Sequence, residues 1–309
     1  YQALQERAGA GAEVIRRHGA RHLAYLGSSD VAFPVALFAS AWAGVPFLPL
    51  NYRLGPDSLQ AQLAAHEDVL VVADPVAAGA VEGSAVTILS TDEWNAATRE
   101  PVEAAPSSTD GDDIAVLLYT SGTTAAPKAV VLRHRHLTSY VIGAVEFASA
   151  DETDATLVSV PPYHIAGVAN AVSNVYSARR IVYLPVFTPE AWLGTVQAEG
   201  ITHAMVVPTM LARVVEHLGG AEAGCGSLRS LADRSGYAEA FLVVCTPRLT
   251  SRVDVRAGEQ PLEASGCDAN GYAWSLLEPL DVDVAFRATL MDLVGGLMSA
   301  TSWWIALAV

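Results

Sequence analysis

Residues 119–130 read Tyr-Thr-Ser-Gly-Thr-Thr-Ala-Ala-Pro-Lys-Ala-Val and contain the only lysine of the 309-residue chain. The remaining fixed cations among the 18 lysines and arginines are all arginine. Small and hydroxylated residues offer backbone N–H groups and hydroxyls to phosphate oxygens, and the ammonium of Lys128 adds a compact positive charge. The stretch therefore predicts a phosphate-binding loop. A surface turn is the alternative, because clusters of Gly, Ser, Thr and Pro commonly form turns.

The sequence on both sides of this loop predicts strands. Residues 114–119 and 129–132 are apolar and rich in β-branched side chains, and a helix is expected from about His136 to Phe147. In a Walker P-loop the lysine is followed by Ser or Thr and opens a helix. Here Ala129 follows Lys128, and a strand follows the loop. The strand–loop–strand pattern therefore argues against a P-loop NTPase.

Helical and strand patterns alternate over the first 230 residues, which predicts an α/β fold. Gly44 stands where a helix stop is expected. Residues 101–113 are rich in Pro, Ser, Asp and Gly and read as a linker or long surface loop. The other expected helices are 1–18, 31–43, 59–66, 189–198 and 209–218, and the other expected strands are 23–26, 45–50, 69–72, 156–160, 181–184 and 202–207.

Composition narrows the classes of function. A net charge of −15 disfavours a nucleic-acid-binding surface. The basic cluster at 133–136 is either a helper in nucleotide binding or a solvated helix start. Three widely spaced cysteines and no visible signal peptide indicate the cytoplasm. The apolar residues 293–309 fall short of the roughly 20 needed to span a bilayer, so membrane association is not expected, although a tail anchor, a buried helix and a non-native tail stay open.

The loop resembles the signature of the acyl-adenylate-forming superfamily of AMP-dependent synthetases and ligases, Tyr-Thr-Ser-Gly-Thr-Thr-Gly-x-Pro-Lys-Gly-Val. Ala125 and Ala129 replace two of its glycines. Residues 1–4, 43–51, 161–167 and 207–211 are similar to further segments of that family, in the same order. The resemblance covers about residues 1–231 and fits the acyl-CoA synthetase branch best, notably through the segment that contains His164.

The resemblance implies a fold and a set of site residues. The fold would be the stacked-sheet large N-terminal domain of an AMP-binding synthetase. Lys128 would be catalytic, following the departing pyrophosphate, and His164 would lie near the acyl group; a histidine satisfied by the core is the alternative for His164. Alanine at the two glycine positions restricts the loop unless those residues have ordinary backbone angles. The residues expected to hold the β- and γ-phosphates are Thr120, Ser121, Gly122, Thr123 and Thr124.

The implied reaction is ATP-dependent activation of a carboxylic acid, with fatty acids as the expected class. The carboxylate attacks the α-phosphate of ATP to give an acyl-adenylate, and coenzyme A then displaces AMP. The implied co-substrates are ATP with Mg²⁺ and coenzyme A. Positioning and charge neutralisation do the chemical work, so no covalent nucleophile is required.

The resemblance ends near Leu231. The Tyr-Gly-x-Thr-Glu motif that the family carries next is absent from residues 232–309. We therefore expect a partial AMP-binding domain over 1–231 and an atypical tail over 232–309, which we hypothesise to be an altered reading frame or a recombined segment. Two functions stay open: an impaired acyl-CoA synthetase, or an inactive fragment that binds nucleotide weakly or serves as an interaction module. An incomplete core also predicts poor solubility.

Overall fold

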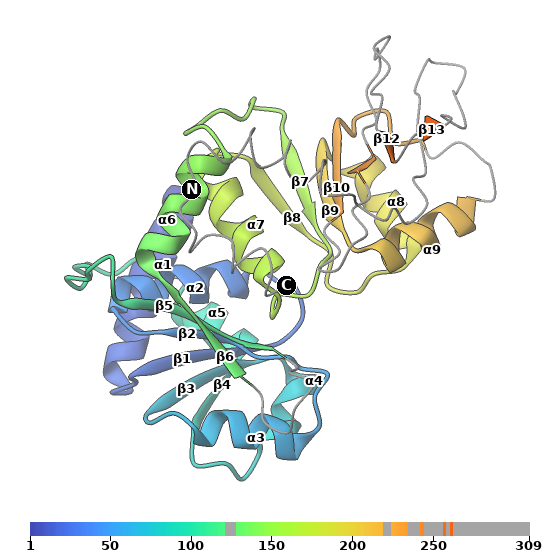
Figure 1. The fold of residues 1–309 in the computed structure, drawn as a ribbon. Coiled ribbons are helices and arrows are strands. Elements are labelled where there is room, and N and C mark those ends of the chain that lie inside the picture. Colours follow the sequence, from blue (N-terminus) through green and yellow to red (C-terminus); the bar gives the residue numbers. More distant parts are fainter. Residues whose placement is uncertain (121–127, 219–223, 234–241, 244–255, 258–259, 262–309) are drawn as a thin grey trace. The chain divides into compact units, whose positions relative to one another are not determined.

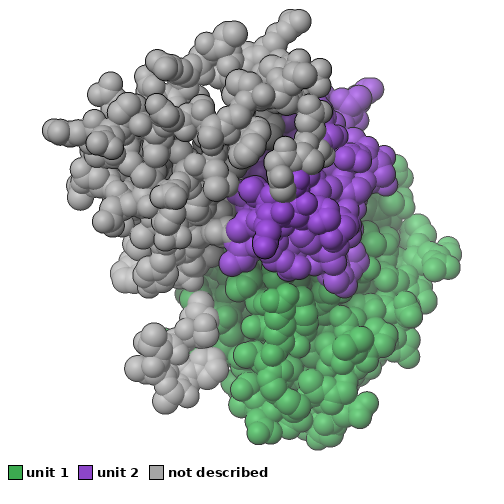
Figure 2. Space-filling view, turned by 90° about the vertical axis from the view of Figure 1, so that its right-hand side faces the viewer, with its two compact units in different colours: residues 1–144, 161–175 green, residues 145–160, 176–309 purple. Residues whose placement is uncertain are grey.

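The computed structural model describes residues 1–120, 128–218, 224–233, 242–243, 256–257 and 260–261. These residues form two compact units, coloured separately in Figure 2: unit 1 comprises 1–144 and 161–175, and unit 2 comprises 145–160 and 176–309. Helices and strands alternate along the chain, so the expected α/β class is confirmed.

Unit 1 is built on a six-stranded sheet in the order β4-β3-β1-β2-β5-β6. The first five strands pair in parallel, whereas β5 and β6 are antiparallel. The strands β1 and β3 are apolar and buried throughout most of their length, as parallel strands covered on both faces are. The bounds are β1 His22–Leu26, β2 Phe47–Pro49, β3 Val69–Ala73, β4 Thr87–Ser90, β5 Ile114–Thr120 and β6 Lys128–Arg133.

Helices cover both faces of this sheet. In Figure 1, α1 (Gln2–Arg17), α2 (Ala32–Ala43) and α5 (Thr91–Ala97) lie on one face, and α3 (Pro56–Ala64) and α4 (Pro75–Ala78) lie on the other. The short 3-10 helix η1 spans Gly79–Val81, and α6 (His134–Ala144) and α7 (Ile165–Tyr176) complete unit 1. Alternate residues of β1 and β3 pack against Leu59 and Leu63 of α3 in one buried apolar cluster. That cluster also takes in Leu117 of β5 and the partly buried Tyr119.

The ends of these helices follow from local sequence. Gly44 ends α2 with φ of 72°, a left-handed conformation that suits glycine, which confirms the expected helix stop. Ser90 and Glu93 form a capping box that starts α5. Pro56 begins α3 three residues before the expected start at Leu59, because proline is well tolerated in the first helical turn. Residues 74–100, for which no element was expected, contain α4, η1, β4 and α5.

The segment after α5 is fastened to unit 1. Residues 101–110 have no regular secondary structure, as expected for a loop. The guanidinium of Arg16 donates to the carbonyls of Trp42 and Ala105 and to Oγ of Ser107. The backbone N–H of Ser107 donates in turn to the Trp42 carbonyl at 2.8 Å. The segment is therefore a strap on α1 and α2 and not a free linker.

Unit 2 contains a second sheet in the order β11-β10-β9-β7-β8. Its strands pair in parallel except for β10 with β11. Buried residues of α8 (Pro189–Ala198) and α9 (Pro208–Leu218) pack on this sheet, with Trp192, Val196 and Leu211 in the core. The bounds are β7 Ala155–Val158, β8 Arg180–Tyr183, β9 His203–Val206, β10 Ser230–Asp233 and β11 Leu242–Val243, and a separate pair is formed by β12 Arg256–Ala257 and β13 Gln260–Pro261.

Most of the expected tail over 232–309, including the apolar stretch 293–309, lies outside the described residues, so its boundary and origin stay predictions. Within the part of the chain that the structure describes, no helix is long and apolar enough to cross a membrane.

Candidate functional site

The phosphate-loop candidate is carried by an antiparallel hairpin. Tyr119 of β5 pairs with Ala129 of β6, and Thr120 pairs with Lys128, so the two ends of the loop lie side by side. The Lys128 side chain is exposed. Ser121, Gly122, Thr123 and Thr124 fall among residues 121–127, outside the described residues. The strand–loop–strand arrangement read from the sequence is confirmed, and a helix-mounted Walker loop is excluded.

The substitution at Ala129 is compatible with the strand. Ala129 lies within β6 and is absent from the described non-glycine residues with positive φ, which are Asp68, Ala148 and Ala178. An ordinary β conformation is open to alanine at no steric penalty. Glycine is therefore not required at this position for the backbone to form the hairpin. Ala125 lies outside the described residues.

His164 lies in a turn that leads into α7. Its backbone N–H donates to the Pro161 carbonyl, and the N–H of Gly167 donates to the His164 carbonyl. A Cβ atom on Gly167 would lie 2.8 Å from both Cα and O of Pro162. Glycine is needed here because the first turn of α7 touches the Pro162 backbone. Glycine at position 167 is thus a packing requirement of the turn that carries His164.

A row of rings supports His164. The ring centroids of Tyr163 and His164 lie 4.4 Å apart, and Tyr52 meets Tyr163 edge-to-face at 5.5 Å. The guanidinium of Arg53 lies 5.6 Å from the Tyr52 ring, within the range of a cation–π contact. Tyr163 is buried, whereas His164 and Arg53 are exposed. The exposed imidazole therefore rests on a packed aromatic base, which rules out a histidine enclosed by the core.

The charges around this turn favour a neutral imidazole. Desolvation lowers the pKa of His164, and the positive charge of Arg53 lowers it further. Burial raises the pKa of the Tyr163 hydroxyl, so that group stays protonated at neutral pH. A neutral imidazole next to an exposed guanidinium can accept or donate one hydrogen bond while the guanidinium attracts an anion.

Sequence reasoning missed Tyr52 and Arg53. Both follow directly after the recognised segment 43–51, and their contact with the His164 turn is made across a long stretch of chain. Adjacency to that segment was the one signal that could have found them.

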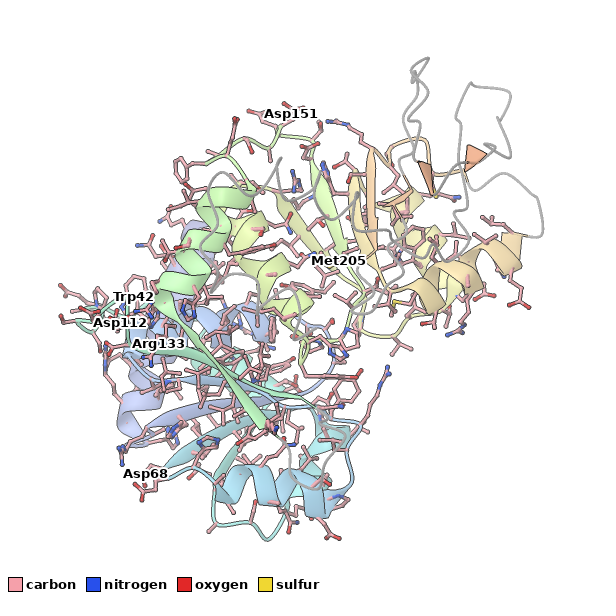
Figure 3. The ribbon with its side chains drawn as sticks, viewed as in Figure 1. Trp42, Asp68, Asp112, Arg133, Asp151 and Met205 are labelled. Carbon is pink, nitrogen blue, oxygen red and sulfur yellow. The ribbon has the colours of Figure 1, made fainter. Side chains whose placement is uncertain are left out.

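The arginines of the basic cluster at 133–136 contact the turn before β5. Arg133 pairs with Ile114, at the end of the hairpin opposite to Lys128. Arg133 donates to the Asp112 carbonyl, and Arg135 forms an ion pair with the Asp112 carboxylate. Figure 3 shows Arg133 and Asp112 close together. These cations therefore hold the turn before β5, and a role in nucleotide binding is not supported.

Curated proteins with similar sequences include several CoA ligases. A feruloyl-CoA synthase from Amycolatopsis sp is 31% identical over 238 residues, which cover 75% of this chain and 48% of the relative. An indoleacetate–CoA ligase from Aromatoleum aromaticum is 28% identical, covering 71% of this chain and 47% of the relative. This chain thus spans about half the length of the curated relatives it matches.

Solved structures with a similar fold match about the same share of this chain. The ATP-bound MatB from Rhodopseudomonas palustris superimposes with a TM-score of 0.64 at 27% identity, covering 75% of this chain and 48% of that one. The N-terminal domain of FACL13 from Mycobacterium tuberculosis matches with a TM-score of 0.66 at 20% identity over 75% of this chain and 62% of that one, which shows the shared fold. The sequence profile described as "AMP-binding enzyme" matches residues 1–265. The chain therefore belongs to the AMP-binding enzyme family.

Proposed function

We propose that this chain supplies the nucleotide-binding part of a CoA ligase that activates a carboxylic acid with ATP. A carboxylate oxygen attacks the α-phosphorus, and pyrophosphate leaves with the electron pair of the broken P–O bond. The thiolate of coenzyme A then attacks the acyl carbon of the adenylate, and AMP leaves. Both steps need charge neutralisation and alignment of the reacting atoms.

One observation carries the proposal: the β5–β6 hairpin sets Thr120 opposite Lys128 at the two ends of the loop 121–127. The loop contains three hydroxyl side chains and a glycine, and Lys128 presents an exposed ammonium beside it. We assign Thr120, Ser121, Gly122, Thr123 and Thr124 to the β- and γ-phosphates and Lys128 to the departing pyrophosphate.

The His164 turn supports the part of the proposal that concerns the carboxylic acid substrate. An exposed neutral imidazole held on Tyr163, with Arg53 nearby, offers a hydrogen bond and a positive field to a carboxylate or to its adenylate. We assign His164 to the acyl group. The relatives are named for feruloyl, indoleacetate, 2-succinylbenzoate, malonate and fatty-acid substrates, so aryl and fatty acids both belong in the test.

The described residues do not gather three His, Cys, Asp or Glu side chains that could hold a metal ion. In this proposal magnesium arrives bound to the phosphates of ATP, and no step is assigned to a metal held by the described residues. The proposed enzyme would act in the cytoplasm.

The second candidate function is nucleotide binding without turnover. It is favoured by the absence of the Tyr-Gly-x-Thr-Glu motif from residues 232–309. The two candidates share the phosphate loop and differ in whether an acid is consumed.

Exchange of labelled pyrophosphate into ATP separates the two functions. We expect exchange that depends on one acid from a panel of ferulate, indoleacetate, 2-succinylbenzoate, malonate and palmitate. Lys128→Met should lower the exchange about 100-fold, because it removes a charge that acts in the transition state. Lys128→Arg keeps the charge and serves as the matched variant. ATP binding without exchange for any acid would support the binding module, and no ATP binding would refute both.

A further inference from the structure

The end of the β5–β6 hairpin has few ties to the rest of unit 1. The register between β2 and β5 consists of a single pair, Phe47 with Val116. From Leu117 onward the strand partner of β5 is β6, which is the last strand of the sheet. Side chains must therefore hold this end of the hairpin, where Thr120 and Lys128 lie.

Two side chains of β5 reach across to the α3 side of the sheet. Leu117 is buried in the apolar cluster that contains Leu59 and Leu63 of α3. Tyr119 is half-buried against the same cluster, and its hydroxyl reaches the residues at the end of α3. Figure 1 shows the β5–β6 hairpin extending toward α3.

The hydroxyl of Tyr119 has two partners there. Nε2 of His66 lies 2.6 Å from Oη of Tyr119, and Oη donates to the Gln62 carbonyl at 3.4 Å. A neutral imidazole donates its Nε2–H to Oη in one tautomer and accepts the hydroxyl proton at Nε2 in the other, and both tautomers make this hydrogen bond. The two rings meet edge-to-face with centroids 6.0 Å apart. The chain of hydrogen bonds thus runs from His66 through Tyr119 to the α3 backbone.

Other contacts fix the orientation of His66 itself. Its backbone N–H donates to the Leu63 carbonyl, and its ring lies against the ring of His22 of β1, with centroids 4.8 Å apart. The His22 Nδ1 lies 2.9 Å from the Glu67 carbonyl, so that neighbour is also held. Burial lowers the pKa of His66, and His22 adds to this effect, so the imidazole is neutral at pH 7.

We propose that His66 is a positioning residue for Lys128: through Tyr119 it holds the end of the β5–β6 hairpin at which Lys128 lies. The link is direct, because Tyr119 is the cross-strand partner of Ala129, the residue bonded to Lys128. His66 does not touch the nucleotide in this scheme. The inference rests on the proposed nucleotide-binding function.

A single-site protease gives a readout that does not need catalysis. Lys128 is the only lysine, so endoproteinase Lys-C can cut the full chain only after Lys128. Cleavage of the native protein requires the end of the hairpin to open. We expect Tyr119→Phe to raise the native-state cleavage rate about five-fold, the effect of one net hydrogen bond, while the ring packing is kept.

Isosteric changes at His66 provide the matched pair. His66→Met should raise the cleavage rate by a similar factor. His66→Gln places an amide, which can donate or accept a hydrogen bond, near the position of Nε2 and should restore slow cleavage. Tyr25→Phe is the control in the same unit, because it removes the hydroxyl that donates to the Ser28 carbonyl at 2.8 Å. Tyr25→Phe and the wild type are compared at urea concentrations equally far below their unfolding midpoints. Under these conditions the control should show the Lys-C cleavage rate of the wild type.

The outcomes test the positioning role of His66 separately from the proposed nucleotide-binding function. Faster cleavage in Tyr119→Phe and His66→Met, slow cleavage in His66→Gln and no change in Tyr25→Phe support the positioning role. Equal cleavage rates in all variants, or rates that follow only global stability, overturn it. The same variants are then cut with MgATP present: we expect ATP to slow cleavage of the wild type and to need a several-fold higher concentration in Tyr119→Phe. If ATP protects no variant while the rates differ as expected, the nucleotide-binding function fails and the structural link survives.

Discussion

Replacing Gly167 with alanine should loosen the turn that presents His164. The added Cβ would lie 2.8 Å from Cα and O of Pro162 and 3.1 Å from its carbonyl carbon, well inside the 3.4–4 Å of an ordinary contact. All three atoms belong to the backbone, so no side chain can rotate away, and α7 must shift relative to Pro162. Overpacking of this kind lowers the free energy of unfolding by about 1–3 kcal/mol.

Two other helical glycines give the matched controls. A Cβ on Gly143 of α6 or on Gly194 of α8 meets nothing within 4 Å. Alanine at a helical position without steric conflict is favoured over glycine by roughly 0.5–1 kcal/mol. Gly167→Ala should therefore lower the urea midpoint, while Gly143→Ala and Gly194→Ala should leave it unchanged or raise it. The difference between the Gly167 variant and the controls is expected to reach about 2 kcal/mol.

Hydrogen exchange measured by mass spectrometry shows where the change acts. In Gly167→Ala, the amides at the start of α7 should exchange faster, whereas those of β7 and β9 in unit 2 should not change. The reasoning would be refuted if Gly167→Ala were as stable as Gly143→Ala, because the contact with Pro162 would then be relieved at no free-energy cost. It would also be refuted if exchange became faster elsewhere in unit 1 but not in α7.

Three further results are expected. Folding stability should fall as the pH drops below about 6.5. The pKa values of His66, His164 and His203 are lowered in the folded state, so the unfolded chain binds more protons than the folded chain in this pH range. Urea titrations at several pH values measure the change in stability. Arg53→Gln should raise the pKa of His164, measured by NMR titration of the imidazole, because a nearby positive charge is removed. Arg16→Met should speed amide exchange in the strap after α5 and lower stability by about 1–2 kcal/mol, because the four hydrogen bonds from the guanidinium to Glu13, Trp42, Ala105 and Ser107 are lost.

Local sequence patterns were sufficient for much of the fold. The proline at 189 and the apolar spacing after it predicted α8 with its observed bounds, and Gly44 marked the end of α2. The small residues between two apolar runs predicted a strand–loop–strand turn, and the two strands pair as the antiparallel β5–β6 hairpin. These features depend on interactions within a few residues, which the order of amino acids specifies directly.

Among the elements that were not predicted, α5 and α7 were missed for different reasons. The capping box of Ser90 and Glu93 is readable as Ser-x-x-Glu, so α5 could have been predicted from its own start signal. The sequence of α7, Ile-Ala-Gly-Val-Ala-Asn-Ala-Val-Ser-Asn-Val-Tyr, is harder, because glycine, two asparagines and three valines lower helix propensity. This helix is stabilised by burial, including the paired amides of Asn170 and Asn174, and burial has no local signature.

The residues of the candidate site also fall into those with a local sequence pattern and those without one. Lys128 and its hydroxylated neighbours stand next to one another in the sequence, so their pattern is visible. Tyr52 and His66 act through contacts with Tyr163 and Tyr119, which the topology brings together from distant parts of the chain. A single sequence gives no sign of such a contact.

The place of this phosphate loop in the fold explains why such supporting contacts matter. A Walker loop ends at a helix N-terminus, whose backbone N–H groups and dipole are fixed by the helix itself. Here the loop joins β5 to the edge strand β6, and beyond Val116 neither strand is paired with the interior of the sheet. In the proposed function Lys128 supplies positive charge, and in the proposed link its position depends on Leu117 and Tyr119 and on the α3 residues that hold them. Substitutions that weaken nucleotide binding without touching the nucleotide should therefore gather at the end of α3, where the sequence carries no motif.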